Sequence, residues 1–179
     1  MKQVLNISLA ALCGLALAAC NTSGPARKPE EKRIFAEYHY ALDSILKTTA
    51  GTVAGIELGE PRKMIRTEQV RNAADQDKEG LVYEEKIDSL THYSITYTFE
   101  NDTISEIEVM INCESRDEGD KILTDLKEYY RKKYTAPLMD KGYFVFNCFD
   151  SRKRNFKITL TDNGSADNSV IDMLIYREQ

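Results

Sequence analysis

Cysteines are the residues of this chain whose chemistry depends most on position, and there are four: Cys13, Cys20, Cys113 and Cys148. Cys20 directly follows Leu17-Ala18-Ala19 at the end of an apolar run, apart from the patterned remainder of the chain. Cys113 and Cys148 lie within that remainder. A thiol in such places can be covalently modified, can pair with a second thiol, or can stay a small buried side chain.

The first 19 residues have the pattern of an export signal. Lys2 supplies a positive charge, and the apolar run from 4 to 19 is interrupted only by Asn6 and Ser8. This run is shorter than the roughly 20 apolar residues that a permanent membrane-spanning helix requires. Positive charge, a short apolar core and small residues before a break are typical of a cleaved signal. A retained anchor is disfavoured, because Pro25 and a charged stretch follow.

Leu17-Ala18-Ala19-Cys20 resembles the lipobox of bacterial lipoproteins, in which an aliphatic residue and two small residues precede a cysteine. The resemblance implies cleavage before Cys20, a diacylglycerol on its sulfur and acylation of its new amino group. Two or three acyl chains would anchor the protein durably, because each buried methylene contributes about 0.8 kcal/mol. An ordinary secretory signal with a coincidental cysteine is the alternative.

The residues after Cys20 bear on where such a lipoprotein would face. Asn21-Thr22-Ser23-Gly24 lacks the acidic stretch that sends some members of the family to the cell surface. The resemblance therefore implies a cell-envelope protein that is lipid-anchored to the outer membrane, and a periplasm-facing orientation is favoured over a surface-exposed one. Its membrane partner would be contacted through the lipid on Cys20.

Export also bears on the two remaining cysteines, because Cys13 leaves with the signal and Cys20 carries lipid. In an oxidising compartment, Cys113 and Cys148 favour a disulfide with each other. Closing that loop of about 36 residues would stabilise the fold by roughly 3–4 kcal/mol in the chain-entropy model. Two free buried thiols are the alternative that the sequence leaves open, and a catalytic thiol is the least favoured.

No other residue pattern amounts to a catalytic or metal-binding motif. The only histidines, His39 and His92, have no ligand spacing and fall in predicted regular elements, which favours structural roles. HExxH, GxSxG and Gly-rich phosphate loops are absent. Segment 162–168 offers oxygen ligands but departs from the EF-hand order, so a hairpin loop is favoured over a calcium site. We therefore expect no catalytic residue, no metal and no cofactor.

Charge restricts the class of partner. Loss of residues 1–19 leaves 160 residues and moves the formal charge from −5 to −6. An acidic chain lacks the basic footprint that nucleic acid requires, so no nucleic-acid partner is expected. Arg152-Lys153-Arg154 is a basic connection that could contact anionic lipid or a phosphorylated glycolipid. Such charges are more often simply solvated.

The chain that must position these residues divides into three parts: a signal over 1–19, a lipidated tether over 20–29 and a single domain over 30–179. The tether is rich in small and polar residues. The remaining chain is long enough for a substantial core. Mixed charge and periodic apolar residues indicate a globular domain.

Helical spacing occurs in three places in this domain. Apolar residues three and four apart predict a first helix over 30–49. Pro61 fits the first turn of a second helix over 61–70, where its missing N–H would be unpaired anyway. Ser115 and Glu118 form a capping-box pattern at the start of a third helix over 115–134.

A short strand is predicted over 53–58 and a polar loop over 72–80. Clearer strand patterns come after that loop. Strands over 81–87, 91–99 and 104–112 alternate apolar and polar residues, which predicts one buried face. A two-residue turn between the last two would set Tyr97 opposite Glu106 and mix the faces. A three-residue bulged turn at 101–103 keeps the faces apart. The register it predicts pairs Tyr97 with Ile107, Ile95 with Val109, and Tyr93 with Ile111.

Three further strands are predicted over 143–149, 155–161 and 170–176. The first of them is apolar on both faces, as a central strand covered on both sides would be. The predicted fold class is α+β, in which two three-stranded meanders form one or two antiparallel sheets packed against two to three helices.

Gly55-Ile56-Glu57-Leu58-Gly59, followed by a helix and a meander, is faintly similar to small outer-membrane lipoproteins of the SmpA/OmlA barrel-assembly type. The chain departs from that family by lacking a GMT-like helix opening and by continuing with another helix and three strands. The similarity therefore transfers no functional residue.

These observations predict a non-catalytic, membrane-anchored lipoprotein that holds a partner-binding domain in the cell envelope, with an envelope protein as its partner. A small-ligand-binding or enzyme-inhibitor module is the alternative, which an enclosed apolar pocket would favour over an exposed apolar patch.

Cys20→Ser removes the sulfur that would carry the lipid. We expect the variant to lose labelling by a radioactive or clickable fatty acid and to leave the membrane fraction on cell fractionation. Cys13→Ser serves as the control and should change neither result. Unchanged labelling of Cys20→Ser would contradict the anchor.

Overall fold

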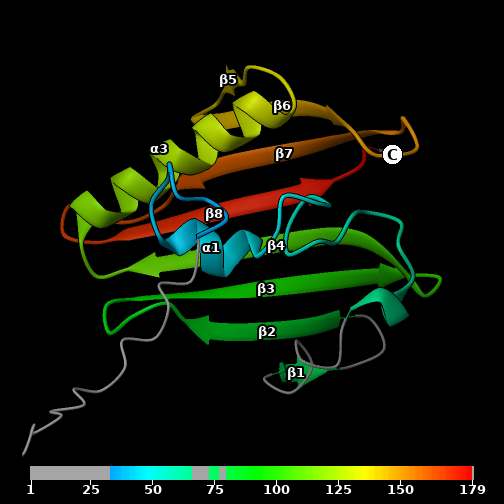
Figure 1. Cartoon of the computed structure of the whole chain (residues 1–179), viewed down its shortest axis with the longest axis horizontal. Coiled ribbons are helices and arrows are strands. Elements are labelled where there is room, and N and C mark those ends of the chain that lie inside the picture. The colour runs from blue at the N-terminus through cyan, green and yellow to red at the C-terminus, as the bar shows by residue number, and fades with distance from the viewer. Residues whose placement is uncertain (1–32, 66–72, 77–79, 179) are drawn as a thin grey trace, which may run out of the picture. The chain divides into compact units, whose positions relative to one another are not determined.

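The computed structural model describes residues 33–65, 73–76 and 80–178, which form an α+β domain on one antiparallel sheet (Figure 1). The predicted signal, lipidation site and tether lie outside the described residues, as do 66–72 and 77–79. The described sheet has eight strands in the order β1-β2-β3-β4-β8-β7-β6-β5. Its strands are β1 (Ala73–Gln76), β2 (Gly80–Lys86), β3 (Thr91–Glu100), β4 (Thr103–Cys113), β5 (Leu138–Asp140), β6 (Tyr143–Phe149), β7 (Asn155–Asp162) and β8 (Ser169–Tyr176).

The hairpin between β3 and β4 has the predicted register but not the predicted turn. Tyr97 pairs with Ile107, and the pairs Ile95–Val109 and Tyr93–Ile111 follow. Glu100 pairs with Thr103, so the turn has two residues, Asn101 and Asp102, both at positive φ. A two-residue hairpin turn requires that conformation. A bulge inside the ladder, where Thr98 pairs with Glu106 but Phe99 with Ile104, restores the alternation of faces.

The two predicted meanders are each one strand longer and join into a single sheet. Strand β1 lies in the predicted polar loop and extends the first meander, whereas β5 extends the second. Strands β4 and β8 are the two central strands of the eight, and they pair along eight residues. The expectation that 143–149 is covered on both faces is wrong: β6 is paired with β5 and β7, but Tyr143 and Phe149 on one of its faces are exposed.

A topological repeat connects the two halves. A helix followed by a four-stranded meander occurs first as α1 (Ala41–Leu46) with β1–β4 and again as α3 (Arg116–Lys133) with β5–β8. The last strands of the two meanders, β4 and β8, pair antiparallel. The sequence shows no such repeat, because the two helices differ in length and the two meanders share no motif.

The first helix is much shorter than the predicted 30–49. Helix α1 has six residues, and Lys47 ends it in the left-handed conformation. The preceding chain is folded back instead: Asp43 accepts hydrogen bonds from the Phe35 backbone N–H at 3.0 Å and from Arg33 Nε at 2.6 Å. These tertiary contacts replace the helical hydrogen bonds that residues 33–40 would otherwise make.

Helix α3 has nearly the predicted bounds but not the predicted cap. Ser115 makes no side-chain capping hydrogen bond, and Glu118 is engaged by His39 and Tyr40 instead. Gly119 allows the helix to approach β8 closely, because a Cβ there would lie 2.0 Å from Ser169 Cβ. The helix contacts β4, β6, β7 and β8.

Segment 53–58 is a turn rather than the predicted strand. Ala54 and Gly55 both have positive φ, and a single bridge joins Val53 to Ile56. In the described part of the second predicted helix, Arg62–Met64 forms one 3₁₀ turn after Pro61; residues 66–70 lie outside the described residues.

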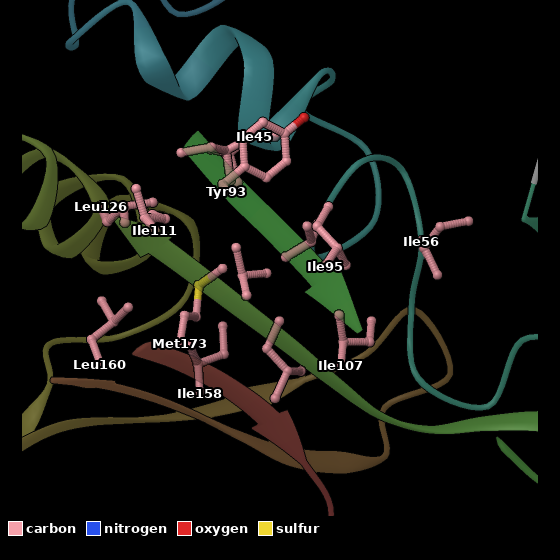
Figure 2. Packing of buried hydrophobic residues seen from close by; sticks show 14 of the residues in the cluster. Ile45, Ile56, Tyr93, Ile95, Ile107, Ile111, Leu126, Ile158, Leu160 and Met173 are labelled. Atoms are coloured by element: carbon pink, nitrogen blue, oxygen red, sulfur yellow. The ribbon is translucent and has the colours of Figure 1, made fainter. Parts of the chain in front are cut away.

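Both helices lie on the same side of the sheet (Figure 1). The core fills the layer between them: Figure 2 shows Ile45 of α1, Leu126 of α3 and strand residues such as Ile107 turned toward one another. Tyr93 and Tyr130 are fully buried. The Tyr130 hydroxyl donates to the Thr52 carbonyl, and the Tyr93 hydroxyl lies between the Ser44 carbonyl at 2.9 Å and Glu85 Oε2 at 2.6 Å. These hydrogen bonds satisfy the polar ends of large buried rings.

The predicted Cys113–Cys148 disulfide is wrong for this fold, in which both cysteines are free and buried. Cys113 pairs with Ser169, the first residue of β8. Cys148 pairs with Phe156, whose neighbour on β7 pairs with Tyr176, the last residue of β8. The two ends of β8 are about 23 Å apart at ~3.3 Å per residue. A disulfide requires Cα atoms within about 7 Å, so the alternative of two free thiols holds.

Buried thiols make a direct chemical prediction. Burial raises the pKa of Cys113 to about 11 and that of Cys148 to about 12, so few thiolates are present at neutral pH. We expect both to resist iodoacetamide in the folded protein and to react fully in urea without reductant, as read by peptide mass spectrometry. A peptide pair linked through Cys113 and Cys148 would contradict the register.

Candidate functional site

The most distinctive surface of the domain is the sheet face opposite the helices, which we call the open face. Alternation along each strand defines it: residues between the buried core positions point away from the helices. The pairing between neighbouring strands then shows which open-face residues lie side by side across the sheet. One row runs from Leu138 through Val145, Thr159, Leu174, Glu108 and Thr96 to Val82.

The half of the open face over β5, β6 and β8 carries large apolar side chains. Leu138, Phe149 and Tyr143 are 63%, 60% and 44% exposed, which is high for side chains of this size. Val145 lies beside Leu138, and Leu174 and Tyr176 continue the surface on β8. We call these six residues the apolar patch. Thr159 and Lys157 of β7 lie between the β6 and β8 members of the patch. Large apolar side chains exposed on one face of a domain mark interaction sites.

The same residues explain why sequence reasoning missed the patch. Tyr143, Val145 and Phe149 alternate with Phe144, Phe146 and Cys148, and the resulting run looks like a doubly covered strand. The structure covers only the second set with α3. A strand that is apolar on both faces indicates that both faces are covered, but not by what. The doubly apolar strand was therefore the one sequence feature that could have indicated an apolar surface awaiting a partner.

The other half of the open face is polar and acidic. Ser94, Thr96 and Thr98 of β3 lie beside Met110, Glu108 and Glu106 of β4. Asp172 of β8 pairs with Met110, so it lies close to Glu108 on the same face. Asp172 Oδ2 accepts a hydrogen bond from Asn163, whereas its Oδ1 is buried without a partner among the described residues.

Surface hollows of about 450–480 Å³ occur on the described domain. One, near the end of β6, is lined by Cys148, Phe149, Phe156 and Lys157 among others. A second lies at the β2–β3 turn and includes Glu84, Asp88 and His92. Their linings mix charged and apolar side chains.

The two histidines lie in separate settings. His39 Nε2 is 2.9 Å from Glu118 Oε1, and its Nδ1 accepts the backbone N–H of Ala41. This ties the start of α1 to α3. His92 is exposed on β3 between Lys86 and Asn112. Within the described residues, no group of three His, Cys, Asp or Glu side chains could hold a metal ion.

Segment 162–168 forms the β7–β8 hairpin loop, and the Asp162 carboxylate at its start is already engaged. Asp162 accepts hydrogen bonds from the Gly164 backbone N–H and the Ser169 hydroxyl, both at 2.8 Å. Arg116 Nη1 lies 3.0 Å from the same carboxylate. Burial alone would raise the pKa of Asp162, but these donors lower it below its usual range. The contacts support the hairpin interpretation over a calcium site.

The basic connection 152–154 is partly structural. Asp150, whose side chain is 1% exposed, lies 2.7 Å from both Arg154 Nε and Arg177 Nη2. Both guanidinium groups also donate to the Leu58 carbonyl. Gly59 admits them, because a Cβ there would lie 2.9 Å from Arg154 Nη2. Arg154 therefore fastens segment 55–59 to the sheet.

A second polar cluster fastens α1 to the edge of the first meander. Glu85 accepts hydrogen bonds from the Tyr83 and Tyr93 hydroxyls, each at 2.6 Å, and from Lys47 Nζ at 3.2 Å. Burial raises the pKa of Glu85, but the three donors outweigh it and lower the pKa overall. The cluster holds Glu85 ionised and hydrogen-bonded, which is a structural role.

Comparisons of the chain with protein-family models, curated proteins and solved structures found no match. The similarity to SmpA/OmlA-type lipoproteins and to the lipobox family therefore stays a prediction from the sequence. Neither helix of the described domain has the length and apolar character that crossing a membrane requires.

Asp150→Asn should destabilise the fold by about 2–4 kcal/mol at pH 7. Removing one partner of a buried ion pair costs roughly 3–5 kcal/mol, and partial exposure of the two arginines lessens the loss. Burial raises the pKa of Asp150, but hydrogen bonds from Arg154 and Arg152 lower it below its usual range. The stabilisation is therefore present above about pH 3.9 and is lost as pH falls through the folded-state pKa.

Urea unfolding of the Asp150→Asn variant and of the natural protein at pH 7 and at pH 3 measures this difference. The gap in unfolding free energy should narrow at the lower pH. Asp167→Asn, which removes an exposed carboxylate from the β7–β8 loop, is the control and should change stability little. A gap that stays constant with pH would contradict the charge-pair account.

Proposed function

We propose that this protein is a non-catalytic, lipid-anchored protein of the cell envelope that binds a protein partner on the open face of its sheet. The observation that carries the proposal is the one-sided coverage of the sheet. Helices α1 and α3 lie on one side, and the other side bears the apolar patch. A sheet face with large exposed apolar side chains gains free energy when a second surface excludes water from it.

The size of the open face supports a protein rather than a small molecule as its occupant. Six strands of seven or more residues contribute to it: β2, β3, β4, β8, β7 and β6. At ~4.8 Å per strand and ~3.3 Å per residue, this area measures about 29 by 23 Å, or about 670 Å². A standard protein interface buries about 800 Å² on each partner.

The lipid anchor completes the proposal and rests on the residues before the described domain. Leu17-Ala18-Ala19-Cys20 resembles a lipobox, and acylation of Cys20 would hold the mature chain at a membrane. A partner in the same compartment would then meet a domain that is held near the membrane surface. The experiment below also distinguishes this function from the alternative of a small-ligand-binding module.

A photoreactive amino acid placed at Leu174 or Thr159 of the full-length chain samples the centre of the open face in intact cells. Thr124, on the exposed side of α3, is the matched control position. We expect protein adducts from the two open-face positions at several times the yield obtained from Thr124. Adducts that are equal from all three positions, or none from Leu174 and Thr159, would overturn a protein-binding open face. A bound small molecule in the purified protein would then favour the ligand-binding module.

A further inference from the structure

We infer that the partner presents arginine or lysine side chains set among apolar or aromatic ones, and that Glu106, Glu108 and Asp172 receive the cations. This inference rests on the proposed function, since it names the chemistry of the surface that the open face binds. Its basis is where these carboxylates lie and what surrounds them.

The carboxylates lie on the two central strands. Glu106 and Glu108 are two residues apart on β4, so they share the open face at a spacing of about 6.6 Å. Asp172 lies across from Met110 on β8, the next open-face position after Glu108. The three side chains form a compact acidic group at the middle of the sheet.

These carboxylates lack compensating cations within the described part of the chain. Glu106 and Glu108 form no ion pair there, and Asp172 accepts only the amide of Asn163. Two lysines lie near these carboxylates in the strand register, but neither forms an ion pair with them. Lys157 is paired with Glu178, and Lys86 lies at the end of β2, toward the β2–β3 turn. Elsewhere in the domain, carboxylates such as Asp150 and Asp162 are matched by arginines.

Apolar and aromatic side chains adjoin the acidic group directly. Leu174 pairs with Glu108, and Tyr176 pairs with Glu106. An arginine of a partner that reached Glu106 would lie over the Tyr176 ring, where a guanidinium both stacks and donates in a fork. The apolar remainder of the partner would cover Leu174 and Val145. Such a combination of anchor residues is typical of interface centres.

Charge also argues against two other occupants. In a two-fold dimer of this chain through the open face, the central carboxylates would face their own copies, and like charges in contact disfavour association. An anionic lipid surface would be repelled for the same reason. A basic, partly apolar protein surface is complementary to the open face in charge and in apolar character.

Glu106→Gln/Glu108→Gln keeps the shape of both side chains and removes their charge. With the photoreactive residue at Leu174 in the full-length chain, we expect the adduct yield to fall about tenfold, because close interfacial charge pairs are lost. Glu100→Gln/Glu114→Gln, which removes two exposed carboxylates near the strand ends, is the charge-matched control and should stay within about twofold. Thermal unfolding of both variants confirms that they fold.

The cross-linked peptides, identified by mass spectrometry, decide the chemistry. We expect an arginine or lysine within a few residues of the adduct, next to an aliphatic or aromatic residue. Adducts that persist unchanged in Glu106→Gln/Glu108→Gln would overturn this inference while leaving a protein-binding open face intact. Adducts to a second copy of the chain would overturn it as well. Absence of adducts from every open-face position would instead contradict the proposed function itself.

Discussion

The pairing of β4 with β8 is the interaction on which the rest of the structure depends. It joins two meanders that α3 separates in sequence, through pairs that run from Glu106–Tyr176 to Cys113–Ser169. Because alternation has a period of two, one register fixes both faces at once. Val109 and Met173 meet under the helices, and Glu108 and Leu174 meet on the open face. A slip of one residue would exchange these sets and expose the core.

Local pattern was enough to predict much of this fold. The alternation over 91–112 determined the β3–β4 register, because only one parity keeps tyrosine and isoleucine side chains together. It did not determine how the parity is met, and the structure uses a bulge at Thr98 and Phe99 instead of a longer turn. The short strands β1 and β5 also escaped prediction, because three or four residues carry too little periodicity.

Features that depend on distant contacts could not be read from the sequence. Residues 33–40 have helical spacing, yet Asp43 and the Asp125 carboxylate, which accepts the His39 backbone N–H at 2.6 Å, hold them in turns. Cys113 is the last residue of β4 and Cys148 the last but one of β6, and the sequence does not say that those strands run in opposite directions. The order β4-β8-β7-β6 places an even number of strands between them, which makes β4 and β6 antiparallel. The two thiols therefore lie at opposite ends of the sheet.

The open face carries two kinds of side chain that have opposite effects on association. Apolar side chains such as Phe149 favour association with any apolar surface, whereas central carboxylates oppose association with most of them. Charges that serve only to protect a sheet from aggregation are most effective on its edge strands, where backbone groups are unpaired. Glu106 and Glu108 lie on β4, which is paired on both sides. If the open face binds the proposed partner, their position discriminates among approaching surfaces and favours those that bring positive charge to the middle of the sheet.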